Sequence, residues 1–363
     1  MARLIYIDNL RSALSVLVVG HHSALAVSGL GSWYFSVSEP HLEEPIASAV
    51  VATLLFTTQA FLTGLLFLIA GLLTPRSLAE KGAWKYFLGR LWRLALPALL
   101  VGLPVHHFSQ WLGDQFSGGE ASTLDFRLSS GPGVAWFELW LLAFETVFLL
   151  VSPKQARRAL KSVGRSVNLG SIFLCVVFLA FVQFAVEMHV AKPLASVFPH
   201  WRGLSHHIIH TPLYGFCFGC GSLCETSLLT MLSAHARPLG IACALSMGLC
   251  FLFALGRDQT QPERASNSLA VAIGALMTVS VCAGASIRLL VAFEAYFSKR
   301  SLLSDLSGLS YAVNLLHPMI VVLLTPLVAT LSLGLISQIA ILWASSAAVS
   351  YGVAGLIRCI SIV

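Results

Sequence analysis

The sequence predicts an all-helical protein that crosses a membrane about ten times, with both ends of the chain in the cytoplasm. Three observations support this fold class. Of the 363 residues, 57% are hydrophobic and only 10% are charged, whereas a soluble chain is usually about 25% charged. Apolar segments of membrane-spanning length recur along the chain, and the basic residues favour alternate connections between them. We therefore expect residues 1–363 to form one transmembrane domain without a soluble module.

Ten apolar segments have the length of a transmembrane helix, about 17–25 residues. They lie at residues 10–29, 50–73, 90–111, 134–151, 169–188, 207–224, 237–256, 268–292, 310–329 and 335–357. No stretch between them exceeds about 25 residues, which is too short to bury a core of its own. The first segment carries ionisable residues and has no small-residue cleavage site after it, so we expect a retained span and not a removed signal peptide.

Lysine and arginine are distributed unequally between the two sides that these spans define. Fifteen of the 22 lie on the side of the termini, mainly in residues 74–93 and 152–166, and five lie on the opposite side. Because basic residues accumulate in cytoplasmic connections, this asymmetry places both termini in the cytoplasm and favours an even number of spans. The net charge of +6 is explained by this topology and does not indicate a nucleic-acid partner.

Three ionisable residues, Asp8, Arg11 and His22, lie in the first span or directly before it. Ionisable side chains within hydrocarbon are costly and mark a functional site by default. Arg11 and His22 are eleven residues apart, so at about 100° per residue they share one helical face, about 16 Å apart along the axis. The neighbouring His21 points about 80° away from that face, so we favour His22 as the functional histidine. A local ion pair between Asp8 and Arg11, three residues apart, is the structural alternative for those two residues.

Two groups of metal-ligating residue types also stand out. One falls on a single predicted helix: Cys217, Cys220 and Cys224. The other falls in the predicted exterior connection and the span after it: His200, His206, His207 and His210. Small residues packing against a glycine-rich helix explain the cysteines better than a metal half-site does. No cysteine or acidic ligand is spaced with the histidines, so we predict no metal.

Four segments of the chain resemble, in order, the acyltransferase 3 family of integral membrane O-acyltransferases. The opening IDNLRSALSVLVVGHHSA (Ile7–Ala24) matches the family pattern of Asp, two residues, Arg, ten residues and His in the first span. The other three segments are Phe67–Pro97, with an arginine-rich helix start before the proline, the Trp/Phe-rich Trp136–Leu150, and SYAVNLLHP (Ser310–Pro318). The sequence departs from the family at Ala70–Gly71, where many members have Ser-Gly.

This resemblance implies transfer of an acyl group from acyl-CoA to a hydroxyl, with His22 as the expected general base and Arg11 and Asp8 beside it. Acetyl or succinyl is the group that the family usually transfers. The family includes glucan-modifying and antibiotic-modifying branches, so the acceptor stays open among carbohydrate, lipid and small molecule. Arg90 and Arg93 are implied to bind the phosphates of acyl-CoA, to which guanidinium is well suited. Ordinary cytoplasmic anchoring is their structural alternative.

Further polar residues within the spans are candidates for binding substrate. His317 precedes Pro318, so it either satisfies a carbonyl that the proline frees or lines the site; the resemblance favours the site. Glu138 and Glu145 are seven residues apart on one face, and two carboxyls in hydrocarbon need partners. We expect Arg288 or the histidines to supply them, unless Glu138 reaches water at the exterior. Trp136 lies near the start of the same span, and we place it with these residues along the substrate.

Two other functions remain open from the sequence. An isomerase or cyclase acting on an apolar, terpenoid-like lipid would use Glu138 or Glu145 as an acid and would not depend on Arg90 or Arg93. A transporter would use the same polar residues as a proton relay, although the chain has no visible inverted repeat of the kind that transporters carry.

Overall fold

The computed structural model describes residues 4–31, 33–37, 44–118, 132–151, 168–197, 202–223, 233–256 and 268–360, and the regular structure in these ranges is helical. The longer helices are α1 (Ile5–Ser28), α2 (Pro45–Lys81), α4 (Leu103–Phe116), α5 (Trp136–Leu150), α7 (Leu169–Val186), α9 (Arg202–Leu223), α11 (Ala236–Gly256), α12 (Ser268–Tyr296), α14 (Ser310–Ala329) and α15 (Leu335–Ile360). The shorter ones are α3 (Ala83–Arg90), α8 (Lys192–Val197) and α13 (Leu302–Leu306).

Nine helical segments in these ranges are long and apolar enough to cross a membrane, which confirms an integral, multi-pass membrane protein. Each corresponds to a predicted span, and α14 has the predicted limits, 310–329. The predicted span 207–224 corresponds to α9, which is a helix but is not among the nine. It carries several polar residues, including His207 and His210, and these lower its hydropathy.

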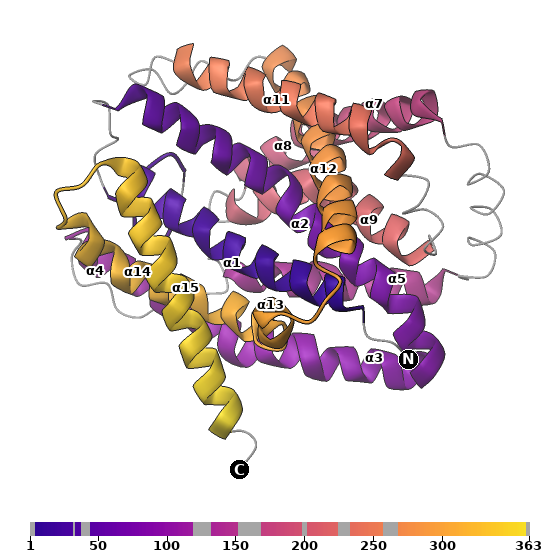
Figure 1. Ribbon diagram of the computed structural model, residues 1–363, viewed down its shortest axis with the longest axis horizontal. Helices are drawn as coiled ribbons and strands as arrows, with labels where there is room; N and C mark the ends of the chain where they lie inside the picture. The colour runs from indigo at the N-terminus through magenta and orange to yellow at the C-terminus, as the bar shows by residue number, and fades with distance from the viewer. Residues whose placement is uncertain are drawn as a thin grey trace.

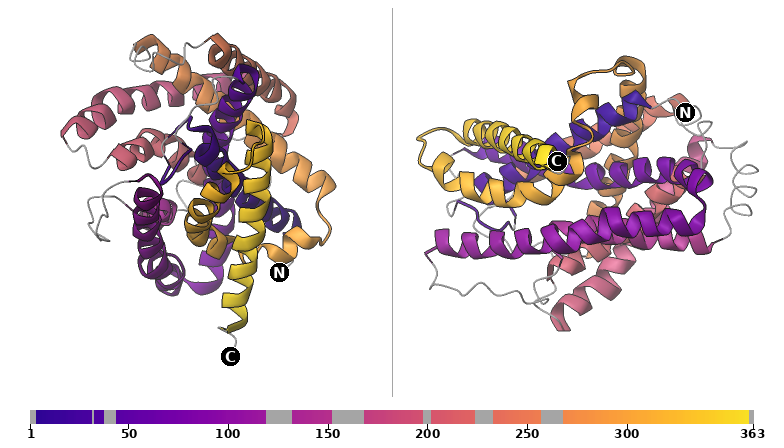
Figure 2. Two further views of the ribbon diagram at one scale, coloured as in Figure 1. Left: turned by 90° about the vertical axis from the view of Figure 1, so that its left-hand side faces the viewer. Right: turned by 90° about the horizontal axis from the view of Figure 1, so that it is seen from below.

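The helix α1 runs through the middle of the bundle (Figures 1 and 2), where it contacts α2, α12, α13, α14 and α15. A cluster of buried residues from α1, α2, α14 and α15 surrounds its second half and includes Val19, Val321 and Leu342. By contrast, α7 and α11 lie at the edge and expose large apolar side chains such as Phe173 and Phe253. This distribution is typical of a bundle in lipid, since apolar side chains on its outer surface contact hydrocarbon.

Glycines allow α2 and α9 to cross at backbone contact. A Cβ atom added to Gly71 would lie 2.2 Å from the carbonyl oxygen of Phe218, and one added to Gly221 would lie 2.2 Å from that of Leu68. Small residues at a crossing let two membrane helices approach closely. Cys217, on the same helix, packs with its Sγ 3.9 Å from that of Cys282 on α12. These contacts support packing as the role of this glycine- and cysteine-rich segment; Cys224 lies outside the described residues.

The third span is a continuous helical segment, Ala83–Phe116, interrupted by two π-helical turns on either side of Pro97, at Leu91–Ala95 and Ala98–Gly102. Proline lacks the N–H that would continue the α-helical hydrogen-bond ladder, and wide turns of this kind are frequent at functional sites. The hydroxyl of Tyr311 on α14 donates to the carbonyl of Leu94 in the first turn, at 3.0 Å. This bond ties the wide turn to the helix that carries His317.

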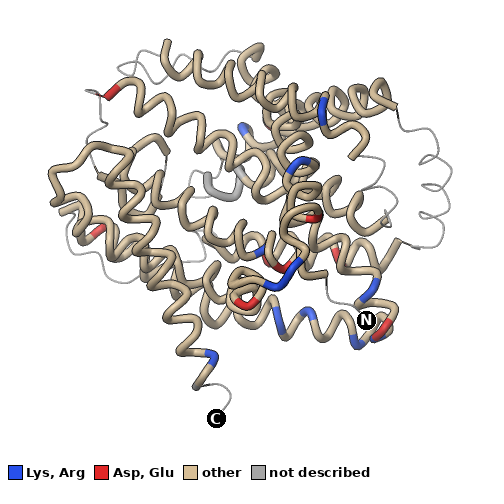
Figure 3. Tube along the Cα trace, in the orientation of Figure 1, with Lys and Arg blue, Asp and Glu red and all other residues tan. Residues whose placement is uncertain are grey.

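Basic residues gather toward one end of the bundle, as the charge asymmetry predicts. Figure 3 shows them on α3, around α13 and near the C-terminal end of α15, on the side where both termini lie. The connection before α13 is fixed to the start of α1, since the Asn9 side-chain amide donates to the carbonyls of Phe297 and Lys299, at 2.7 and 3.1 Å. The end of α1 nearest Asp8 and Arg11 is therefore anchored.

The close crossing of α2 and α9 predicts a difference between two glycines. Gly71→Ala places a methyl group against backbone atoms, so we expect it to lower the free energy of unfolding by about 1–3 kcal/mol. Gly219→Ala is the matched control, because a Cβ there meets no described atom within 4 Å. We expect the control to stay within about 1 kcal/mol of the original. Thermal unfolding in detergent, followed by circular dichroism, compares the two; equal midpoints would contradict the account of the crossing.

Candidate functional site

His22 on α1 and His317 on α14 form a hydrogen-bonded pair inside the bundle. The Nδ1 atom of His22 lies 2.8 Å from Nε2 of His317, and the two rings are nearly parallel, at 17°, with centroids 4.9 Å apart. The rings therefore meet edge to edge through their nitrogens. His317 has no exposed surface, and its own Nδ1 lies 3.1 Å from the carbonyl oxygen of Val313.

These contacts fix the tautomers of a neutral pair. A carbonyl only accepts hydrogen bonds, so Nδ1 of His317 carries the proton and its Nε2 is an acceptor. His22 must then donate from Nδ1, which leaves its Nε2 as the basic nitrogen. His317 binds the carbonyl of Val313, one turn earlier, and also faces His22. The carbonyl that Pro318 frees in an α-helix is that of Asn314, four residues before the proline, so this contact with Val313 does not test the structural role that the sequence offered for His317.

A tryptophan covers one face of the His22 ring. Trp33, in the connection between α1 and α2, stacks on His22 with centroids 4.1 Å apart and planes at 16°. The next residue, Tyr34, hydrogen-bonds through its hydroxyl to Nδ1 of His106 on α4, at 2.7 Å. Burial raises the pKa of the Tyr34 hydroxyl, and the tautomer of His106 determines which of the two groups donates. The sequence did not predict that Trp33 contacts His22, because the two residues share no helix or motif.

His21 points away from this pair, as the helical geometry predicts. Its Nδ1 lies 2.7 Å from the hydroxyl of Thr58 on α2, and that hydroxyl donates to the carbonyl of Leu54 at 2.7 Å. His21 therefore connects α1 to α2, whereas His22 connects α1 to α14.

Glu138 lies beside the helix that carries His317. Its carboxyl accepts a hydrogen bond of 3.0 Å from the side-chain amide of Asn314, one turn before His317 on α14. Only 1% of Glu138 is exposed, and its second oxygen, Oε2, has no hydrogen-bond partner among the described residues. The alternative that Glu138 reaches exterior water is therefore wrong, and so is the expected partnership with Arg288 or a histidine. Asn314 was missed because its spacing from Glu138 in the sequence carries no signal.

Glu145, two turns further along α5, is the centre of a second buried network. It forms an ion pair with Arg90 and accepts a hydrogen bond of 2.9 Å from the hydroxyl of Tyr86. Arg90 donates to the same hydroxyl at 3.1 Å, and the Tyr86 hydroxyl also lies 3.3 Å from that of Thr74. The expected partner of Glu145 was also wrong. The positive charge beside this carboxyl belongs to Arg90, at the start of the third span, and not to Arg288.

The remaining predicted site residues lie around these two networks. Arg11 and Asp8 approach to 3.9 Å, and the Arg11 side chain keeps 38% of its surface exposed. Arg93 is exposed within the first π-helical turn. Trp136 stacks on His207 of α9, with centroids 3.9 Å apart and planes at 14°. The fold thus brings His22 and His317 together and pairs Arg90 with Glu145, while Trp136 joins a separate aromatic contact.

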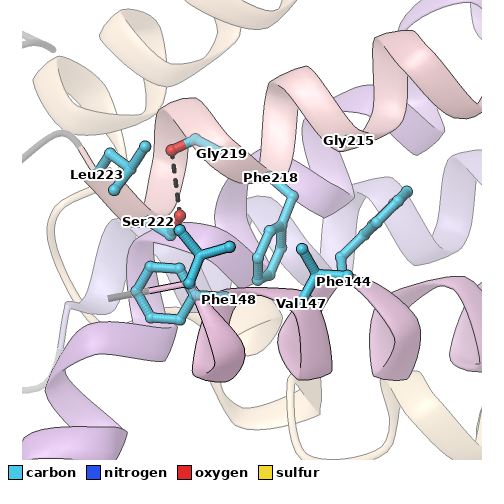
Figure 4. A pocket seen from close by; sticks show the side chains of 9 residues that line it. Phe144, Val147, Phe148, Gly215, Phe218, Gly219, Ser222 and Leu223 are labelled. Atoms are coloured by element: carbon cyan, nitrogen blue, oxygen red, sulfur yellow. Dashed lines mark hydrogen bonds between the residues drawn. The ribbon is translucent and has the colours of Figure 1, made fainter. Parts of the chain in front are cut away.

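A cavity of about 270 Å³ lies between α5 and α9 (Figure 4). It is lined by Phe144, Val147, Phe148, Val151, Gly215, Phe218, Gly219, Ser222 and Leu223. The one polar side chain in this lining, Ser222, already donates to the carbonyl of Gly219, at 3.1 Å, so the cavity offers no ionisable group for chemistry. No cluster of three metal-ligating side chains occurs within the described ranges; those ranges include His207 and His210 but not His200.

Comparison with known proteins identifies the family. Neither the curated proteins nor the solved structures include a match to this chain. The model of the acyltransferase 3 family, described as an acyltransferase domain, matches residues 4–358. This match covers nearly the whole chain and includes all of the residues discussed above, so the protein belongs to the acyltransferase 3 family and is a membrane acyltransferase.

Proposed function

We propose that the protein transfers a short acyl group, acetyl or succinyl, from acyl-CoA to a hydroxyl of a carbohydrate, lipid or small-molecule acceptor. The observation that carries the proposal is the His22–His317 pair, which leaves Nε2 of His22 unprotonated in the neutral state. A base near the acceptor hydroxyl is the first requirement of such a reaction.

In the proposed reaction, Nε2 of His22 takes the proton of the acceptor hydroxyl as the oxygen attacks the thioester carbonyl. The tetrahedral intermediate then collapses, the carbon–sulfur bond breaks, and the thiolate of CoA takes the proton from His22. The products are the O-acyl acceptor and free CoA. His317 accepts the hydrogen bond from Nδ1 throughout, so it orients the ring and stabilises the imidazolium that forms.

The donor would bind at the basic end of the bundle. Arg93 is exposed there, and Arg90 keeps a quarter of its side-chain surface exposed while it is paired with Glu145. A guanidinium held by a buried carboxylate presents its remaining donors in a fixed direction, which suits a phosphate. Arg11, partly exposed beside Asp8, would guide the thioester toward His22. Glu138, with its unpartnered oxygen, would accept a hydrogen bond from the acceptor.

The histidine pair predicts a graded loss of activity. We expect His22→Ala to lower turnover of acetyl-CoA by about 10²–10⁴-fold, the usual contribution of a general base. His317→Gln should lower it less, because the base remains but loses its orientation. His189→Ala is the control, since His189 is exposed on another helix. Release of CoA from radiolabelled acetyl-CoA by protein in detergent measures turnover. Full activity in His22→Ala would contradict the assignment.

The Arg90–Glu145 pair predicts that donor binding and stability can be separated. Arg90→Met alone leaves a buried carboxylate uncompensated, at a cost of about 3–5 kcal/mol in stability. Arg90→Met combined with Glu145→Leu removes both charges, so we expect the unfolding temperature to recover. If Arg90 contacts the donor, the dissociation constant for acetyl-CoA should still rise.

Isothermal titration of the folded double variant with acetyl-CoA measures this dissociation constant. The same titration of Arg93→Gln measures the contribution of the exposed arginine alone. Unchanged affinity in both would overturn the donor site. If the original protein neither binds nor cleaves any acyl-CoA, the donor assignment itself fails, and proton transfer on an apolar lipid becomes the function to test.

A further inference from the structure

The connection after α1 turns back into the bundle at the end where that helix stops. Gly29 adopts a left-handed conformation, with φ of 64°, which ends α1. The backbone N–H of Val37 then donates to the carbonyl of Ala26, at 3.0 Å, so the chain folds against the last turn of α1. Trp33 lies within this returning segment and reaches the ring of His22.

The returning segment is held from its other side by α4. The carbonyl of Tyr34 packs so closely on Gly113 that a Cβ there would lie 2.0 Å from the oxygen. The Tyr34 hydroxyl is hydrogen-bonded to His106. The Tyr34 ring packs edge-on against Trp33, with centroids 4.7 Å apart. Three contacts therefore fix the indole over the imidazole.

The indole N–H of Trp33 distinguishes this placement from ordinary core packing. A buried tryptophan usually finds a hydrogen-bond acceptor for this group. The Nε1 atom of Trp33 is buried, yet no acceptor for it exists among the described residues. The indole N–H therefore lacks a hydrogen bond among the described residues, while the face of the ring is stacked on His22. It also lies nearly parallel to His317, at 20°, so the planes of all three rings are aligned.

We propose that Trp33 is a positioning residue for His22. This inference rests on the proposed function. His317 fixes one edge of the imidazole and Trp33 fixes one face, so Nε2 is held in a single direction in the plane of the ring. An aromatic face also attracts a cation within about 6 Å of its centroid, and tryptophan does so best. Trp33 thus stabilises the imidazolium that forms when His22 takes the proton.

Two substitutions separate the face of the ring from its N–H group. Trp33→Phe keeps an aromatic face and removes the N–H; Trp33→Leu removes both. We expect Trp33→Leu to lower kcat for acetyl-CoA turnover by about 10–100-fold, the effect of a misplaced catalytic group, with KM nearly unchanged. Trp33→Phe should retain most of kcat. Trp84→Leu, at a tryptophan that is 70% exposed, is the control.

A second readout does not depend on turnover. Diethyl pyrocarbonate modifies unprotonated imidazole, and mass spectrometry of peptides gives the rate at each histidine. We expect His22 to react several-fold faster in Trp33→Leu than in the original protein, and at the original rate in Trp33→Phe. If the original protein does not turn over acetyl-CoA, the proposed function fails, and this labelling still tests whether Trp33 covers His22.

Should Trp33→Leu not fold, Tyr34→Phe serves in its place, because it releases the segment from His106 and keeps every ring. We expect a smaller change in kcat and in labelling, both in the same direction. Equal loss of kcat in Trp33→Phe and Trp33→Leu would overturn the proposal by assigning the effect to the N–H group. Original kcat and original labelling of His22 in Trp33→Leu would overturn it as well.

Discussion

The hydrogen bond between His22 and His317 is the interaction on which the rest of the site depends. It joins α1 to α14, across 295 residues of sequence, and it determines which nitrogen of His22 is basic. A histidine alone on a membrane helix would rotate and could present either nitrogen. The carbonyl of Val313, the His317 ring and the His22 ring form one chain of hydrogen bonds with a single direction. The orientation of the proposed base thus comes from the backbone of α14, next to Pro318.

Polar groups elsewhere in the bundle obey the same constraint, that a group removed from water needs a partner. Thr58 is hydrogen-bonded to His21, and Asn314 is hydrogen-bonded to Glu138. Glu145 forms an ion pair with Arg90 and a hydrogen bond with Tyr86. Several buried side-chain atoms lack a hydrogen-bond partner among the described residues, and two of them are carboxyl oxygens, Oε2 of Glu138 and Oε2 of Glu145. Buried carboxyl oxygens without partners are costly. Both lie on α5, where Glu138 is hydrogen-bonded to α14 and Glu145 is paired with Arg90, and this placement fits a site that a substrate completes.

Much of this organisation could be predicted from the sequence, because hydropathy and helical period are local signals. The positions of the spans followed from composition, although several helices extend five or more residues beyond the predicted limits. The different directions of His21 and His22 followed from 100° per residue. Which helices meet is not a local property. Periodicity placed Glu138 and Glu145 on one face but could not choose Asn314 and Arg90 as their partners. The contact of Trp33 with His22 was missed for a related reason: Trp33 lies in an irregular connection, where no period predicts the direction of a side chain.

The central claim is that His22 and His317 act as one unit in acyl transfer, and a double-mutant cycle on acetyl-CoA turnover tests it most directly. When two residues act independently, the fold-losses of activity from the two substitutions multiply in the double variant. When they act as a unit, the loss in the double variant is smaller than that product. The account predicts that His22→Ala combined with His317→Gln is no slower than His22→Ala alone, because His317 has no imidazole left to orient once His22 is removed. A double variant slower by the full product of the two single losses would contradict the account.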